Sequence, residues 1–96
     1  MIIVIGKITV NPARKDKALA LCLEHVQRSR AEPGCLDHRV SVDCEDEAKM
    51  TFVEHWQDMA ALKTHFAVKA SQDFVKDLTA CLTEPPEMKI YEAGEV

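Results

Sequence analysis

The stretch Phe52-Val53-Glu54-His55-Trp56 has the alternating pattern of a β-strand, and the rest of the chain is best interpreted outward from it. Successive side chains of a strand point to opposite faces, so Phe52, Glu54 and Trp56 share one face. That face carries a carboxylate between two large aromatic rings. A strand that only packs into a core does not need an acid there, so Glu54 is the first candidate functional residue.

The elements around this strand follow the order β-α-β-β-α-β. Strand-like runs cover residues 2–10, 35–43, 49–57 and 88–92, and helical spacing covers about 12–30 and 58–83. Asn11-Pro12 and Asp58 are expected to begin the helices, and Ser71 to cap a second helical piece within 58–83. This order predicts one α+β domain over residues 1–96, with a ferredoxin-like antiparallel sheet and helices on one face.

Helices on one face leave the other face of the sheet open. The strand residues expected beneath the helices are Val4, Gly6, Ile8, Leu36, Val40, Met50, Phe52, Trp56, Met88 and Ile90. The open face has an apolar middle with polar edges, formed by Ile3, Ile5, Thr51, Val53 and Tyr91. An exposed apolar patch of this kind is usually an interface, so we expect a homodimer that pairs sheet against sheet. The alternative is a solvated sheet face in a monomer.

Polar residues beneath the helices indicate a small-molecule pocket. Glu54 and His38 are expected on the strands, His65 on the second helix, and Gly6 on the same face, where it leaves room. A carboxylate near a histidine can fix the imidazole tautomer and raise its basicity. Each residue also has a structural interpretation: Trp56 as core, His65 as a helix edge, and Glu54 as an ion-pair partner. His25 lies beside the apolar stripe of the first helix and is expected to be solvated.

Composition excludes several classes of function. The chain of 96 residues is 47% hydrophobic and carries a net charge of −4 without a basic stripe, which argues against nucleic acid as a partner. It shows no secretory signal pattern and no membrane span of roughly 20 apolar residues, so we expect a cytoplasmic protein. The four cysteines have no C-x-x-C spacing and are expected to be reduced. The four histidines have no recognisable metal-ligand spacing and the three glycines form no phosphate-binding loop, so neither a dedicated metal site nor a nucleotide site is expected.

Three segments together resemble the antibiotic biosynthesis monooxygenase family. They are Ala31-Glu32-Pro33-Gly34-Cys35-Leu36, then Phe52-Val53-Glu54-His55-Trp56, then Ala61-Leu62-Lys63-Thr64-His65-Phe66, with Phe74 further on. Each motif is short, but their order and spacing are fairly specific, and the resemblance covers about residues 2–92. It implies a dimeric α/β barrel. It also implies cofactor-independent oxidation of a phenol or hydroquinone to a quinone by dioxygen, with the substrate itself as the source of electrons.

The resemblance also implies roles for individual residues. His65 would be the catalytic base or hydrogen-bond partner, with Glu54 as the second catalytic residue. Phe52, Trp56 and Phe66 would hold the aromatic ring, His38 would orient its polar end together with Glu54, and Gly6 would leave space. The partners implied are a second copy of the chain, an aromatic small molecule and dioxygen.

Other activities are known among proteins of this type and remain as alternatives. Relatives that degrade haem use an asparagine on the first strand and a histidine on the last helix. Here Gly6 or Lys7 occupies the first place and no histidine follows His65, so haem degradation is not expected. Other relatives isomerise small phosphorylated carbonyl compounds, an activity that a lysine or arginine in the pocket would favour, and none is clearly placed beneath the helices. A dimer that binds a small molecule without turnover is the third possibility.

Overall fold

The computed structural model describes residues 1–96 and has the expected β-α-β-β-α-β order, with the second helical region divided in two. The strands are β1 (Ile2–Thr9), β2 (Cys35–Val42), β3 (Lys49–Trp56) and β4 (Glu87–Glu92). The helices are the short 3-10 helix η1 (Pro12–Arg14), α1 (Lys15–Ser29), α2 (Met59–Ala67) and α3 (Lys69–Thr79). The strands form one antiparallel sheet in the order β2-β3-β1-β4. The ferredoxin-like α+β prediction is therefore confirmed.

The helices begin largely where their capping residues indicate. The Asn11 side chain accepts a hydrogen bond from the Ala13 amide, but the first turn is 3-10 and the α-helix starts only at Lys15. Asp58 caps α2 by accepting from the Ala61 amide at 2.9 Å. The prediction for Ser71 is wrong, because the helices are separated at the extended residue Val68 and Ser71 is buried within α3.

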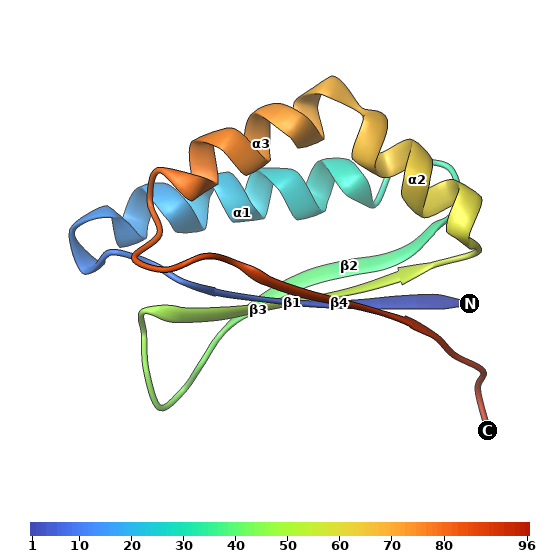
Figure 1. The fold of residues 1–96 in the computed structure, drawn as a ribbon, viewed down its shortest axis with the longest axis horizontal. Helices are drawn as coiled ribbons and strands as arrows, with labels where there is room; N and C mark the ends of the chain where they lie inside the picture. The colour runs from blue at the N-terminus through green and yellow to red at the C-terminus, as the bar shows by residue number, and fades with distance from the viewer.

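All the helices lie on one side of the sheet and none covers the other side (Figure 1). Between the layers, apolar side chains from β1, β3, α1 and α3 form the main core, which includes Ile8, Val10, Cys22, Val26, Met50, Phe52 and Leu78. A second cluster lies toward the α2 end of the sheet and contains Ile2, Val4, Trp56 and Leu62. The space between these two clusters is where polar side chains enter the interior.

Two predictions about the helix-covered face are wrong. A register irregularity between Cys35 and Asp37 places Cys35 opposite Trp56, so Leu36 leaves the buried face and is 58% exposed. Met88 and Ile90 have the expected register beside β1 but remain exposed, since β4 is an edge strand that the helices do not cover. The interior is consequently open along β4.

The bare face of the sheet carries the expected residues. Ile3 lies opposite His55 and Tyr91, and Ile5 lies opposite Val53, so these side chains share the face away from the helices. Val53 and Tyr91 are exposed in the single chain. None of the helices combines the length and the apolar character that crossing a membrane requires.

Candidate active site

A cavity of about 390 Å³ lies between the helices and the sheet and opens beside β4. This volume is within the usual range for sites that bind small molecules. Its walls are largely apolar, with side chains from β1, β3, α3 and the segment before β4. Six of the seven residues expected at the site line it: Gly6, His38, Phe52, Glu54, His65 and Phe66. Alternation along β1 and β3, together with helical spacing in α2, is sufficient to bring these residues together.

Trp56 is the exception, because it is fully buried and does not line the cavity. Trp56 was expected to hold the aromatic ring of a substrate, but it presents no surface to the cavity with which to do so. Its ring instead lies beside His65, with 4.6 Å between ring centroids, and its Nε1–H donates to Glu54 Oε1 at 2.9 Å. Trp56 thus supports two polar side chains from behind the cavity wall.

Glu54 is the carboxylate of the cavity floor. Burial raises its pKa above the usual value for a glutamate, and the hydrogen bond from Trp56 opposes that rise. Its Oε2 lies 3.6 Å from His38 Nε2 and its Oε1 lies 4.0 Å from His65 Nε2, distances too long for direct hydrogen bonds. Glu54 is therefore held by Trp56 while it faces two imidazoles across gaps that a polar group of a ligand could bridge.

Glu32 is a site residue that the sequence had indicated only as part of a segment resembling the family. Its Oε1 lies 2.9 Å from His65 Nδ1, and both side chains are largely buried. An ionised carboxylate can only accept, so Nδ1 carries the proton and donates to Glu32. In the neutral form of this imidazole, Nε2 of His65 has the free lone pair, and this nitrogen lies 4.0 Å from Glu54 Oε1. This carboxylate–imidazole arrangement is the one by which proteins fix the tautomer of a general base.

The turn at Gly34 holds Glu32 against α2. Gly34 has φ +80°, a left-handed conformation that favours glycine, and a Cβ at this position would lie only 2.5 Å from the Cβ of Ala61. The Gln57 amide also donates to the Gly34 carbonyl at 2.8 Å. The close approach of backbone to helix explains why the Glu-Pro-Gly sequence and the Ala61–His65 segment occur together in one site.

His25 is buried, contrary to the expectation of a solvated edge residue. It follows Cys22 by three residues, so it continues the buried stripe of α1, and its ring stacks on Phe74 at 3.9 Å with an interplanar angle of 4°. Arg28 Nη2 lies 2.9 Å from His25 Nδ1. Arginine can only donate, so His25 Nδ1 accepts and Nε2 carries the proton.

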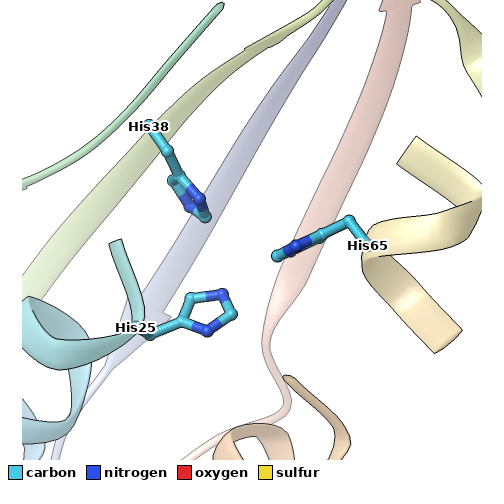
Figure 2. Close-up of side chains that lie close together, drawn as sticks. All are labelled: His25, His38 and His65. Atoms are coloured by element: carbon cyan, nitrogen blue, oxygen red, sulfur yellow. The ribbon is translucent and has the colours of Figure 1, made fainter. Parts of the chain in front are cut away.

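Three imidazoles converge beside the cavity, from α1, β2 and α2 (Figure 2). Each of His25, His38 and His65 offers a ring nitrogen within 4.8 Å of the others. Burial lowers the pKa of both His25 and His38 to about 3, with the neighbouring imidazoles adding to the effect, so both rings are neutral near pH 7. Residues 25, 38 and 65 come from separate elements, which is why their sequence spacing shows no metal-binding motif.

Comparison with known proteins identifies the family. A sequence model described as "Antibiotic biosynthesis monooxygenase" matches residues 1–77. The chain is 35% identical over 94 residues to "Uncharacterized protein sll1783" of Synechocystis, covering 98% of this chain and 64% of that protein. It is 30% identical over 95 residues to "Putative monooxygenase YcnE" of Bacillus subtilis, covering 99% of this chain and 100% of that protein.

The fold agrees with this family. A solved structure named "putative antibiotic biosynthesis monooxygenase from Deinococcus radiodurans" superposes with a TM-score of 0.95 at 27% identity, covering 100% of this chain and 95% of that one. The match extends over the strands and helices that surround the cavity. The chain belongs to the antibiotic biosynthesis monooxygenase family.

Proposed function

We propose that the chain oxidises a phenolic or hydroquinone small molecule to a quinone with dioxygen, using side chains of this cavity. The observation that carries the proposal is the buried Glu32–His65 pair, with 2.9 Å between Oε1 and Nδ1. It holds a basic nitrogen at a cavity large enough for an aromatic molecule. Membership of the family and the name of the Bacillus subtilis relative support the reaction class.

The first step of this oxidation is removal of the phenolic proton by a base. His65 Nε2 takes the phenolic proton, and the resulting anion is electron-rich enough to pass electrons to dioxygen. A hydroquinone gives up two electrons and two protons, forming a quinone and hydrogen peroxide. A phenol that takes up one oxygen atom uses four electrons and forms a quinone and water. The apolar walls, among them Phe52, Phe74 and Leu78, limit the water that surrounds the reactive anion on the sides away from the opening at β4.

In this proposal, Glu54 and His38 orient the polar end of the substrate. Glu54 Oε1 and His65 Nε2 are 4.0 Å apart, so a hydroxyl between them could contact both. The raised pKa of Glu54 helps it to retain a proton that it can donate to a quinone-like oxygen. Phe52 and Phe66 line the same cavity and offer flat surfaces to the ring.

The test is a panel of hydroquinones, such as menadiol, and polyketide-like phenols, incubated with and without oxygen. We expect quinone formation above autoxidation, dependent on oxygen and abolished by His65→Ala. His55→Ala is the matched control, because His55 lies on the opposite face of the sheet. An unchanged rate in His65→Ala would exclude His65 as the base.

Isomerisation of a small carbonyl compound is a second candidate, because the Glu32–His65 pair beside Glu54 could also move a proton without an oxidant. Lys7 borders the cavity, but it alternates with the buried Gly6 and Ile8, so its exposed side chain points to the face of the sheet away from the helices. Turnover that continues without oxygen and falls in His65→Ala would select this activity over oxidation, whereas stabilisation by a ligand without turnover would indicate a binding protein.

We also propose that the bare sheet face pairs with a second copy of the chain. Its apolar side chains, including Ile5, Val53 and Tyr91, are uncovered in the single chain, and a 96-residue domain gains stability from burying them. We expect a dimeric mass in light scattering at micromolar concentration. Val53→Lys should yield a monomer, while the exposed helix substitution Val75→Lys should leave the dimer intact. A monomeric wild type would contradict the proposal.

A further inference from the structure

The cluster of His25, His38 and His65 contains a feature that the oxidation chemistry does not require. The ring centroids are 5.2 Å apart for His25–His38 and His25–His65, and 5.8 Å apart for His38–His65. The rings approach one point from three directions and are not stacked on each other (Figure 2). His55, the remaining histidine, lies on the other face of the sheet.

The centroid spacing matches that of three imidazoles bound to one metal ion. With metal–nitrogen bonds of about 2.0 Å, a ring centroid lies about 3.2 Å from the metal, so tetrahedral imidazoles have centroids about 5.2 Å apart. The ring nitrogens, now within 4.8 Å of each other, would have to approach to about 3.3 Å in such a site. Two of the three centroid distances already equal 5.2 Å and the third, His38–His65, is 5.8 Å, so reorienting the rings accomplishes most of this change with little movement of the backbone.

An unpartnered side chain gives independent support. Both ring nitrogens of His38 are buried and neither has a hydrogen-bond partner, although the residue is only 1% exposed. Buried polar atoms in folded proteins are normally paired, and a group left unpaired calls for an explanation such as an ion. Arg30 contacts the backbone carbonyl of His38 rather than its ring. A metal ion in the cluster would satisfy one of these two nitrogens.

The surroundings of His65 suit a ligand to a metal. Metal-binding histidines usually donate their second N–H to a carboxylate or a carbonyl, which orients the ring. His65 does so through Nδ1 to Glu32 at 2.9 Å, which leaves Nε2 for the ion. Glu54 lies beside Nε2 of both His38 and His65, so its carboxylate is near the position where a fourth ligand or a substrate would bind.

His25 must change its partner to take part. Arg28 donates to Nδ1, so Nε2 carries a proton that metal binding would displace. The proton can move to Nδ1 only if Arg28 turns away. Arg28 is partly exposed and already lies 3.8 Å from Glu24, so an alternative partner is available to it.

We propose that His25, His38 and His65 together bind one divalent transition-metal ion of the type that prefers nitrogen ligands, such as Zn²⁺ or Co²⁺. The cavity supplies the open coordination position. The site goes beyond the proposed oxidation, and it uses the same lone pair of His65. A redox-inert ion such as Zn²⁺ should therefore inhibit the base-dependent reaction, which makes the cluster a point of control by metal.

The test measures binding directly, without substrate. The full-length protein is dialysed against a chelator, then titrated with Zn²⁺ by calorimetry and with Co²⁺ by visible absorption. We expect one ion per chain and the intense visible bands of tetrahedral Co²⁺. His38→Ala and His25→Phe should weaken binding at least about 100-fold, since losing even an outer-shell partner costs 10- to 100-fold. The phenyl ring of His25→Phe can keep the stack on Phe74, so this variant guards against a folding defect.

His55→Ala is the matched control and should bind as the wild type does. Arg28→Gln should tighten binding, because the competing donor to His25 is removed. Absence of one-to-one binding by the wild type at micromolar metal would overturn the proposal. Wild-type affinity for the metal in both His25→Phe and His38→Ala would overturn it too. Since no substrate is present, these results stand whether or not the chain oxidises hydroquinones.

Discussion

Lowering the pH from 7.5 to 5.5 should destabilise the protein through its buried histidines. His25 and His38 have pKa values of about 3 in the folded chain, chiefly because burial disfavours the charged imidazolium. In the unfolded chain a histidine titrates near 6.5. The unfolded state therefore binds more protons between these values, and stability falls as the pH falls through this window. The stability these residues contribute is present above pH 6.5 and is lost progressively below it.

The size of this loss in stability depends mainly on the pKa of histidine in the unfolded chain. Each histidine that stays neutral in the folded state costs about 1.4 kcal/mol per pH unit below 6.5, so the two together cost about 2.7 kcal/mol between pH 7.5 and 5.5. The groups that face them are Arg28, Arg30, His65 and Glu54. The raised pKa of Glu54 acts in the opposite direction, since its folded form takes up a proton more readily.

The assay is urea denaturation at several pH values, followed by circular dichroism and by the fluorescence of Trp56, the only tryptophan. His25→Phe should halve the dependence on pH between 7.5 and 5.5, whereas the control His55→Ala should retain it. Glu54→Gln removes the opposing contribution and should steepen the dependence. Equal stability at the two pH values in both wild type and Glu54→Gln would refute the assignment of neutral, buried imidazoles.

Three substitutions test the structural support of the site. Gly34→Ala should cost about 2–4 kcal/mol in denaturant unfolding, because it combines a positive φ with a Cβ 2.5 Å from that of Ala61, and Ala61→Gly should recover part of the loss. Trp56→Phe should cost about 2–4 kcal/mol, since it leaves Glu54 Oε1 buried without its donor and opens space in the core. Gly6→Leu should weaken ligand binding measured by calorimetry with little change in fold, because a Cβ there meets nothing closer than 3.6 Å while a longer side chain fills the cavity. A loss below 1 kcal/mol in either of the first two, or unchanged binding in the third, would contradict these assignments.

Alternation and helical spacing were enough to predict the cavity floor. Phe52 and Glu54 share a face of β3 because of the two-residue period, and His65 reaches the same space from α2. Trp56 follows the same alternation, but its end of β3 lies beneath α2, where Leu62 and Ile2 pack around it. Whether an inward side chain lines the cavity or packs into the core therefore depends on its position along the strand. The alternation of polar and apolar residues does not indicate that position.

The contacts that the sequence did not predict form between residues far apart in the chain. Glu32 reaches His65 across 33 positions, through a turn whose geometry depends on Gly34 fitting against Ala61. The burial of His25 could have been found from its spacing after Cys22, but its meeting with His38 and His65 depends on how α1 crosses the sheet. A one-residue bulge moved Leu36 off its expected face. These features arise from packing between elements rather than from any local pattern.

The central claim is that Glu32 holds His65 as the base of an oxygen-dependent reaction in this cavity. Oxygen uptake in the presence of a hydroquinone, measured for wild type and Glu32→Gln beside the control His55→Ala, tests it most directly. A glutamine keeps the shape but lacks the charge that fixes the tautomer and supports the imidazolium, so we predict a rate at least about 100-fold lower, within the range of general-base contributions. A Glu32→Gln enzyme that consumes oxygen at the wild-type rate would contradict the account.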